Sequence, residues 1–99
     1  MRMTNNELSK IFKVLADPKR LSIIEMLSTG EKCACKLLEA FNITQPTLSH
    51  DMKLMCDVGL TIPRREGKWT HYSLNEEKFA EVKAAFEMLT VPHDFEAEK

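Results

Sequence analysis

A short polar turn, Asn42-Ile43-Thr44, separates two segments with helical patterning, and this spacing constrains the fold more than any other feature. The segment before the turn, from about Cys33 to Ala40, is expected to form a short helix. After the turn, Thr44 is a favourable N-cap and Pro46 suits the first turn of a second helix. That helix should end at Gly59 and bury Leu48, Met52 and Met55. Two helices joined by so few residues indicate a helix-turn-helix.

Two short strands are predicted directly after these helices, at residues 60–65 and 68–74, with Glu66-Gly67 as the turn. Pro63 has no backbone N–H to donate, which places the first strand at a sheet edge or a bulge. Helix, turn, helix and hairpin in this order predict a winged helix-turn-helix. The expected fold class is mainly α with a small β-hairpin. We expect one domain over residues 1–99, with a DNA-reading unit at about 33–74.

Further helices are predicted on both sides of this unit. Thr4 and Glu7 form a capping-box pattern that starts a helix near residue 5, and Asp17-Pro18 ends that helix and starts the next. Asn75 caps a last helix over residues 76–89. The apolar stripes predicted for these three helices are Leu8, Ile11, Phe12 and Leu15, then Leu21, Ile24 and Leu27, then Phe79, Val82, Phe86 and Leu89.

The net charge of −1 is unevenly distributed along the 99 residues. Residues 1–72 hold eleven Lys and Arg against eight Asp and Glu, a net charge of +3, and residues 73–99 hold three against seven, a net charge of −4. The total charge therefore neither excludes nor strongly supports nucleic-acid binding. There is no apolar run of about 18 residues and no apolar signal segment at the start, so we expect a cytoplasmic protein without membrane contact.

The second helix of the helix-turn-helix carries small polar and basic side chains away from its apolar face. In this motif the N-terminal part of that helix enters the major groove, where such side chains bond base edges or phosphates. Basic residues at the hairpin tip could reach phosphates or an adjacent minor groove. The alternatives are a solvated helix face and a charged edge strand that resists aggregation. The candidate DNA-binding residues are Gln45, Thr47, Ser49, His50 and Lys53 in the helix and Arg64, Arg65 and Lys68 in the hairpin.

Cys33 and Cys35 are the candidate metal ligands, since two thiolates near the start of a helix favour soft or thiophilic ions. On an ideal helix, side chains two residues apart point about 200° apart, because only i+3 and i+4 neighbours share a face. One ion bound by both sulfurs would therefore distort the first turn, which is a plausible switch. The alternative is a pair of small buried hydrophobic residues. Cys56, near the end of the second helix, is a candidate third ligand or a lone thiol.

The sequence gives less support for a bound zinc ion. A closed tetrahedral zinc site needs four ligands, and residues 1–32 contain neither Cys nor His. His93, Asp94 and Glu96 have the side chains of ligands, but they follow the last predicted helix.

Four motifs give the chain a resemblance to the ArsR/SmtB family of metal-responsive winged-helix repressors, closest to its arsenic-sensing members. They are Ala16-Asp17-Pro18-x-Arg20-Leu21, Cys33-Ala34-Cys35-x-Leu37, Thr44-Gln45-Pro46-x-Leu48-Ser49 and Gly67-Lys68-Trp69-x-His71-Tyr72. The resemblance covers roughly residues 8–89. It implies that Cys33 and Cys35 are ligands, whereas the third cysteine of the arsenic-sensing box falls on Leu38. The N-terminal cysteines of cadmium- or lead-sensing members and the zinc site of the last helix have no counterpart here.

The resemblance also implies a homodimer, with dimer helices at about residues 5–16 and 76–90, that represses transcription without metal. We therefore predict a metalloid-responsive repressor that binds operator DNA and is released by arsenite or antimonite at Cys33 and Cys35. It would have no catalytic residues and no catalytic cofactor. One alternative is a winged-helix repressor switched by thiol oxidation or another soft metal. Others are a thiol enzyme, a metal-buffering protein, or a dimerisation module without DNA contact.

Overall fold

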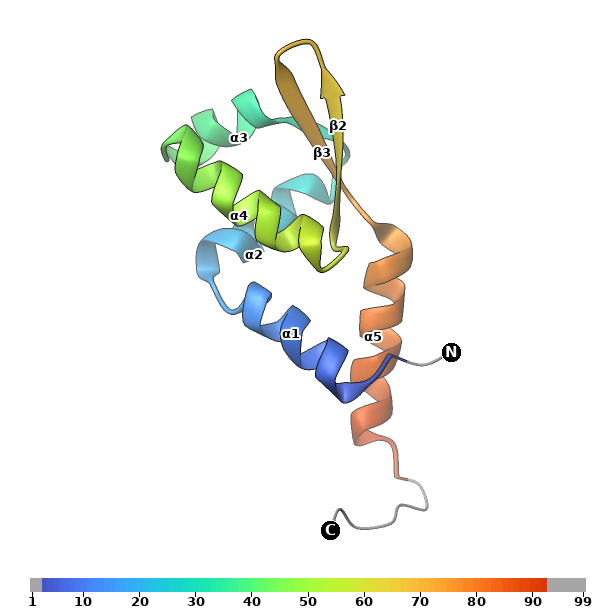
Figure 1. Ribbon diagram of the computed structural model, residues 1–99. Coiled ribbons are helices and arrows are strands. Elements are labelled where there is room, and N and C mark those ends of the chain that lie inside the picture. The colour runs from blue at the N-terminus through green and yellow to red at the C-terminus, as the bar shows by residue number, and fades with distance from the viewer. Residues whose placement is uncertain (1–2, 93–99) are drawn as a thin grey trace.

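The computed structural model of the protein describes residues 3–92 and consists of helices around one small sheet (Figure 1). The hairpin of the sheet projects at one end of the molecule, and the first and last helices lie at the other end. In chain order the elements are α1 (Asn5–Leu15), α2 (Pro18–Leu27), β1 (Lys32–Cys33), α3 (Ala34–Phe41), α4 (Gln45–Asp57), β2 (Thr61–Glu66), β3 (Trp69–Leu74) and α5 (Glu76–Thr90).

The predicted starts of α1, α2, α4 and α5 are confirmed, because each is fixed by a local side-chain cap. Thr4 and Glu7 form the complete capping box of α1. Asp17 accepts hydrogen bonds from the first backbone N–H groups of α2, with a proline in the first turn. Thr44 caps α4 and Asn75 caps α5 in the same way. These caps satisfy donors that the helix itself leaves without partners, so the starts depend on the nearby sequence alone.

The helix-turn-helix is formed by α3 and α4. Asn42 ends α3 in the left-handed conformation, at φ 52°, and its backbone N–H donates to the carbonyl of Leu38. Asparagine tolerates this conformation better than most residues. The chain therefore reverses within residues 42–44 and enters α4 at once, as the sequence predicts.

The sheet has three strands in the order β1-β3-β2, all antiparallel. The predicted hairpin is present, with a turn at Gly67 and Lys68, one residue later than expected. Gly67 has φ +64°, which favours glycine at this position. Pro63 lies in the edge strand β2, as predicted. The expectation of only two strands is incomplete, because β1 pairs Lys32 with Tyr72 and Cys33 with His71.

The principal core lies between α2, α3, α4 and the sheet. Trp69 and Tyr72 of β3 pack against it, as expected for residues that hold the hairpin on the helices. Its buried residues are Ile23, Leu27, Ala34, Leu37, Leu48, Met52 and Met55. The predicted stripe of α2 is wrong at Leu21, which is 51% exposed, whereas Ile23 is fully buried. Because α2 carries apolar residues on both of its faces, periodicity could not select the inner one.

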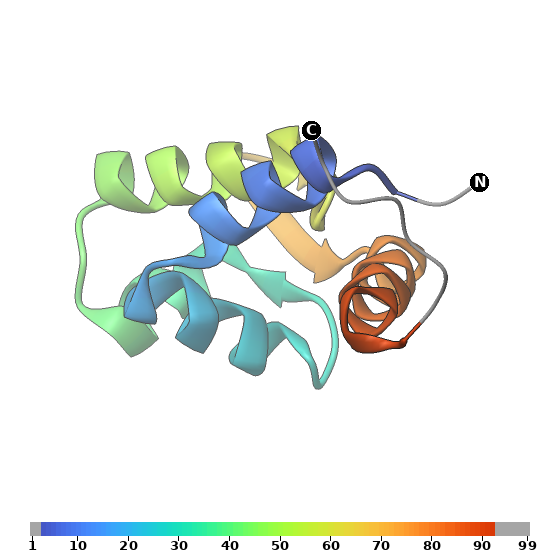
Figure 2. The same ribbon diagram turned by 90° about the horizontal axis from the view of Figure 1, so that it is seen from below.

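A second cluster joins α1 to α5 at the end of the molecule opposite the hairpin tip (Figures 1 and 2). Its buried residues are Leu8, Ile11, Leu60, Val82 and Ala85. The outer parts of the predicted stripes remain exposed at Phe12, Phe86 and Leu89. The rings of Phe12 and Phe86 meet edge to face, with centroids 5.8 Å apart. Among the described residues, no helix is both long and apolar enough to span a membrane.

Candidate nucleic-acid interface and cysteine pair

The outer face of α4 carries all five side chains predicted to contact DNA there. Each of the five is exposed, and the helix turns Leu48, Met52 and Met55 into the core. The five residues are Gln45, Thr47, Ser49, His50 and Lys53. The hydroxyl of Thr47 is also hydrogen-bonded to that of Thr44, at 2.9 Å, as part of the helix cap. Lys53 forms an exposed ion pair with Asp57 at 3.1 Å, leaving its ammonium group accessible.

Asp51 fixes α4 to the preceding helices and was not among the residues predicted from the sequence. The side chain is buried, with Lys19 Nζ 2.9 Å from Oδ2 and Arg20 Nε 3.1 Å from Oδ1. Arg20 also donates from Nη1 to the carbonyl oxygen of Val14, at 3.0 Å. One carboxylate thus connects α4 with α2 and, through Arg20, with α1. A signal was available, because position 51 falls within the spacing of Leu48, Met52 and Met55, where a charged residue needs a partner.

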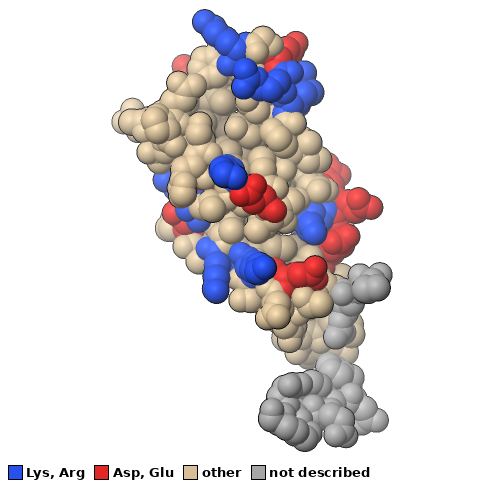
Figure 3. All heavy atoms as spheres, in the orientation of Figure 1, with Lys and Arg blue, Asp and Glu red and all other residues tan. Residues whose placement is uncertain are grey.

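The hairpin carries the other three predicted DNA-binding residues, and all three are exposed. Lys and Arg side chains gather at the hairpin tip in Figure 3. Arg64, however, donates to both carboxylate oxygens of Glu31, from Nε at 2.9 Å and from Nη2 at 2.7 Å. It also pairs with Glu66 at 3.1 Å. Within residues 3–92 the structure records no ion pair for Arg65 or Lys68, so these two are the accessible cations of the hairpin.

The electrostatics of this cluster follow from these contacts. Hydrogen bonds from Arg64 hold the pKa of Glu31 below its ordinary value. The two carboxylates, Glu31 first, raise the pKa of Arg64 above its ordinary value. His71 Nε2 lies 3.5 Å from Glu66, at the same place on the sheet. Arg64 is thus a permanently charged group shared between two carboxylates.

Cys33 and Cys35 come together because Cys33 is extended and not helical, which was not predicted from the sequence. Cys33 is the last residue of β1 and the N-cap of α3, with extended backbone at φ −68° and ψ 144°. Its sulfur accepts a hydrogen bond from the N–H of Cys35 at 3.2 Å. The two sulfurs are joined as a disulfide, and the Cα atoms are 5.1 Å apart.

The predicted helix start at Cys33 is therefore wrong, since α3 begins at Ala34. The expectation that one ion on both sulfurs would distort a helical turn fails with it. An extended Cys33 places its side chain over the first turn rather than on the opposite face. The two sulfur atoms can accordingly face a common ligand without unwinding α3.

Cys56 is not brought to this pair. Its sulfur lies 3.1 Å from the hydroxyl of Thr61, and burial raises the pKa of its thiol. Among the residues the structure describes, no group of three or more His, Cys, Asp or Glu could hold a metal ion. His93, Asp94 and Glu96 lie outside the described residues. The cysteine pair thus offers two ligands, and a third must come from elsewhere.

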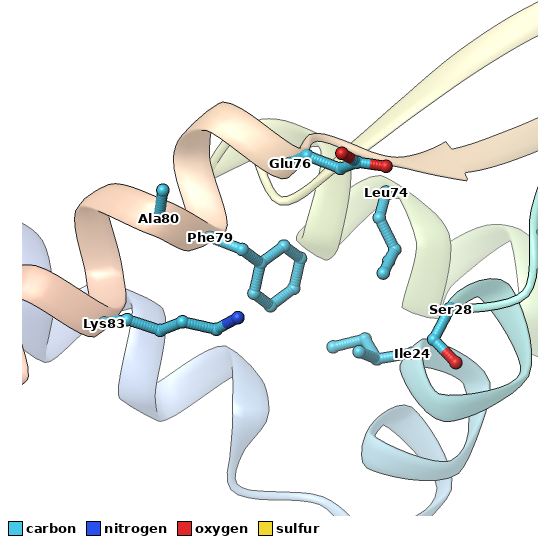
Figure 4. A pocket seen from close by; sticks show the side chains of 7 residues that line it. All are labelled: Ile24, Ser28, Leu74, Glu76, Phe79, Ala80 and Lys83. Atoms are coloured by element: carbon cyan, nitrogen blue, oxygen red, sulfur yellow. The ribbon is translucent and has the colours of Figure 1, made fainter.

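A separate pocket of about 650 Å³ lies between α2 and the start of α5. Figure 4 shows Ile24, Leu74 and Phe79 around one space, with Glu76 and Lys83 also on its lining. This lining is mostly apolar and contains no cysteine. It adds to the apolar surface of α5 but presents no convergent set of ligands.

The comparisons with known proteins identify the family of this fold. The arsR family of bacterial regulatory proteins matches residues 17–61, from the N-cap of α2 to the first residue of β2. An arsenical resistance operon repressor of Staphylococcus xylosus is 53% identical over 75 residues, which cover 76% of this chain and 72% of that protein. The chain belongs to the arsR family. An arsenical resistance operon repressor of Escherichia coli strain K12 is 43% identical over 67 residues, covering 67% of this chain and 57% of that protein.

Solved structures of the same family share the fold. A crystal structure of an ArsR family transcriptional regulator has a TM-score of 0.79 at 25% identity, covering 90% of this chain and 92% of the other. A solution structure of a homodimeric winged helix-turn-helix DNA-binding domain from Mycobacterium bovis has a TM-score of 0.70 at 26% identity, covering 85% and 78%. The predicted fold class, mainly α with a winged hairpin, is confirmed. This arsR-family protein is a DNA-binding transcriptional regulator and not an enzyme.

Proposed function

We propose that the protein represses transcription by binding operator DNA as a homodimer, and that trivalent arsenic or antimony at Cys33 and Cys35 releases it. The observation that carries the proposal is the contact between the two sulfurs at the start of α3, the helix that precedes α4. The arsenical resistance operon repressors among the relatives support the choice of ligand.

DNA recognition would use the exposed face of α4 in the major groove. Gln45 suits adenine, Ser49 bonds bases or phosphates, and Lys53 bonds guanine or phosphate. Thr47 and His50 complete the contact surface. From the hairpin, Arg65 and Lys68 are free to reach phosphates, and Arg64 could do so only by exchanging a carboxylate for a phosphate. Residues 33–74 would thus act as the DNA-reading unit.

Dimerisation would cover the apolar surface that α1 and α5 leave exposed. Phe12, Phe86 and Leu89 are 39%, 55% and 50% exposed, and the first two are in ring contact. Exposed aromatic residues on a continuous helix surface are typical of protein–protein contacts. The homodimeric relative from Mycobacterium bovis supports this arrangement. The segments at about 5–16 and 76–90 would then serve as dimer helices.

Ligand binding requires the reduced protein. Arsenite would lose two hydroxyl groups as water, taking the two thiol protons, and form two sulfur–arsenic bonds without any change of oxidation state. The third hydroxyl group stays on arsenic, and because the structure does not bring Cys56 to the pair, only an external thiol would replace it, with loss of a third water. An allosteric coupling of about 1–3 kcal/mol would weaken DNA binding roughly 5–150-fold.

The deciding experiment is a fluorescence-anisotropy titration of reduced protein on a labelled duplex from its own promoter region. Arsenite, antimonite, cadmium and zinc would be added separately. Release by arsenite or antimonite is expected for the wild type and for Cys56→Ser, the matched control, and is expected to be lost in Cys33→Ser/Cys35→Ser. Normal release of the double variant would refute the ligand assignment. Absence of DNA binding would refute the repressor assignment.

A second candidate signal is oxidation of the pair, which the joined sulfurs favour. Two thiols would give two electrons and two protons to a peroxide, forming the disulfide and water. Mass spectrometry after mild peroxide would show a loss of two hydrogens in the peptide holding Cys33 and Cys35. If oxidation rather than arsenite lowers DNA affinity, and dithiothreitol restores it, this candidate replaces the metalloid.

A further inference from the structure

An ion pair crosses the sheet from the cysteine side to the hairpin. Glu31 comes directly before β1, and Arg64 lies on β2 at the far edge, with β3 between them. The two side chains nevertheless form two parallel hydrogen bonds of 2.9 and 2.7 Å. A two-point contact between a guanidinium and a carboxylate fixes orientation as well as distance. Glu31 and Arg64 therefore connect two strands that do not pair with each other.

The residues beneath this ion pair form a continuous row. Cys33 lies opposite His71 on β3, and His71 lies opposite Arg64 on β2. Directly opposite residues of antiparallel strands project from the same face of the sheet. The row thus runs from a proposed ligand, through His71, to the arginine that Glu31 holds.

We propose that the Glu31–Arg64 ion pair transmits ligand binding at Cys33 and Cys35 to the hairpin, so that the wing moves when the cysteines are occupied. The inference rests on the proposed function, in which the cysteines bind the inducer and the wing contacts DNA. It supplies a route through the sheet that does not require α3 to unwind. Glu31 and Arg64 act here as positioning residues and contact no ligand at the cysteines.

The route follows from the chain between Glu31 and Cys33. Glu31 directly precedes β1, which ends at Cys33, and the sulfur of Cys33 accepts a hydrogen bond from the N–H of Cys35. A ligand bound by both sulfurs takes the place of the direct sulfur–sulfur contact, so it changes the position of the Cys33 sulfur relative to Cys35 and shifts Cys33. Glu31, two residues away, shifts with it. Arg64 follows because its two hydrogen bonds need both carboxylate oxygens in place.

Glu66 provides a matched control, since it also pairs with Arg64, at 3.1 Å, but belongs to the wing itself. Glu31→Gln and Glu66→Gln remove the same charge from the same arginine. Only the first removes a contact with the residues directly before β1, because both partners of Glu66, Arg64 and His71, lie on the hairpin. A general loss of negative charge near Arg64 would affect both variants alike, whereas a transmitted movement would depend on Glu31.

The first measurement uses no DNA. Trp69 is the single tryptophan of the chain and lies on β3 within the wing, so its emission reports on the wing. Arsenite added to reduced wild type is expected to change this emission, and Glu66→Gln should respond in the same way. Glu31→Gln should bind arsenite with similar affinity, followed by sulfur–arsenic absorption in the ultraviolet, but lose most of the emission change. An equal change in Glu31→Gln overturns the proposal.

The second measurement is the ratio of DNA dissociation constants with and without arsenite. Glu31→Gln should bind DNA and lower this ratio several-fold from the wild-type value, and Glu66→Gln should keep it. The charge exchange Glu31→Arg/Arg64→Glu should recover a larger ratio than Glu31→Gln. A ratio equal to that of the wild type in Glu31→Gln refutes the link but leaves the repressor intact. Wild type that binds both DNA and arsenite and is not released refutes the proposed function, and the Trp69 measurement still decides on the link. Wild type that does not bind arsenite refutes both.

Discussion

The two hydrophobic clusters of the molecule differ in how completely the chain itself covers them. The cluster around α2, α3 and α4 contains four residues with no exposed surface, namely Ile23, Leu37, Met52 and Met55. The cluster between α1 and α5 is flanked by Phe12, Phe86 and Leu89, which remain between 39% and 55% exposed. The first cluster is a closed core, covered by the chain itself, whereas the second is an open cluster that continues onto the surface.

This difference indicates that one cluster stabilises the fold of the chain and the other stabilises its association with a partner. A closed core holds α4 and the hairpin in one arrangement without help from another molecule. An open cluster gains its remaining apolar burial only through association, at roughly 25 cal/mol per Å² removed from water. The region around the closed core, which includes α2, should thus be stable without a partner molecule, and association through the open cluster should depend on protein concentration.

The largest difference in the free energy of unfolding is expected between two truncations of equal size, one inside the closed core and one outside it. Leu37→Ala removes a fully buried side chain and should lower the free energy of unfolding by about 2–5 kcal/mol. Leu21→Ala, at a site 51% exposed, should change it by less than about 0.5 kcal/mol. Urea denaturation followed by far-ultraviolet circular dichroism measures both. Similar losses in the two variants would show that the core is not closed as described.

Asp51 joins the two regions, so its removal should be nearly as costly. Asp51→Ala leaves Lys19 and the part-buried Arg20 without their partner and should destabilise the protein by about 3 kcal/mol. The control is Asp57→Ala, which breaks the exposed pair with Lys53 and should cost about 0.3–0.5 kcal/mol. Both values come from denaturant titration. A loss for Asp51→Ala no greater than that of the control would contradict the role assigned to the buried carboxylate.

Substitutions in the open cluster should weaken dimerisation more than they lower the free energy of unfolding. Phe86→Ala removes a ring in contact with Phe12 and should weaken the dimer by about 2 kcal/mol, roughly 30-fold in dissociation constant. Ile62→Ala, at another exposed apolar residue but on β2, should leave the association unchanged. Sedimentation equilibrium distinguishes the two. A monomeric wild type, or equal weakening by both variants, would show that the open cluster between α1 and α5 is not the dimer contact.

The smallest effect is expected on the pH dependence of stability, and it arises from the N-terminal cap of α1, a helix of the open cluster. Hydrogen bonds from Thr4 hold the pKa of Glu7 below its ordinary value of 4.5. Because the folded pKa lies below the unfolded one, the carboxylate stabilises the fold above about pH 4.5, and this contribution is lost as the pH falls through the folded pKa. Glu7→Gln should therefore lose less stability than wild type between pH 7 and pH 3. Urea denaturation at each pH measures this, and the same urea midpoint for wild type and Glu7→Gln at every pH would contradict it.

Local features of the fold could be predicted, and features that depend on distant partners could not. The caps at Thr4, Asp17, Thr44 and Asn75 follow from neighbouring residues, so the helix starts were predicted. The two-residue strand β1 exists only because β3 lies beside it, and no local signal marks so short a strand. Since β1 sets the backbone of Cys33, the arrangement of the sulfurs was missed with it.

The candidate site divides in the same way. The exposed face of α4 was predictable because one periodic pattern separates its inner and outer residues. The contact between Glu31 and Arg64 joins residues 33 positions apart, and the contact between Arg20 and Asp51 joins residues 31 positions apart. Arg64 was therefore predicted to contact DNA in the same way as Arg65 and Lys68, although two carboxylates already hold it.

Pro63 on the edge strand has a consequence for the behaviour of the protein at high concentration. A strand at the rim of a sheet exposes unpaired backbone groups and can recruit strands from other molecules. The proline removes one donor from that rim, and the charged residues that follow it disfavour the stacking of identical segments. The hairpin can thus project into solvent, where a nucleic acid can reach it, without acting as a seed for fibrous self-assembly.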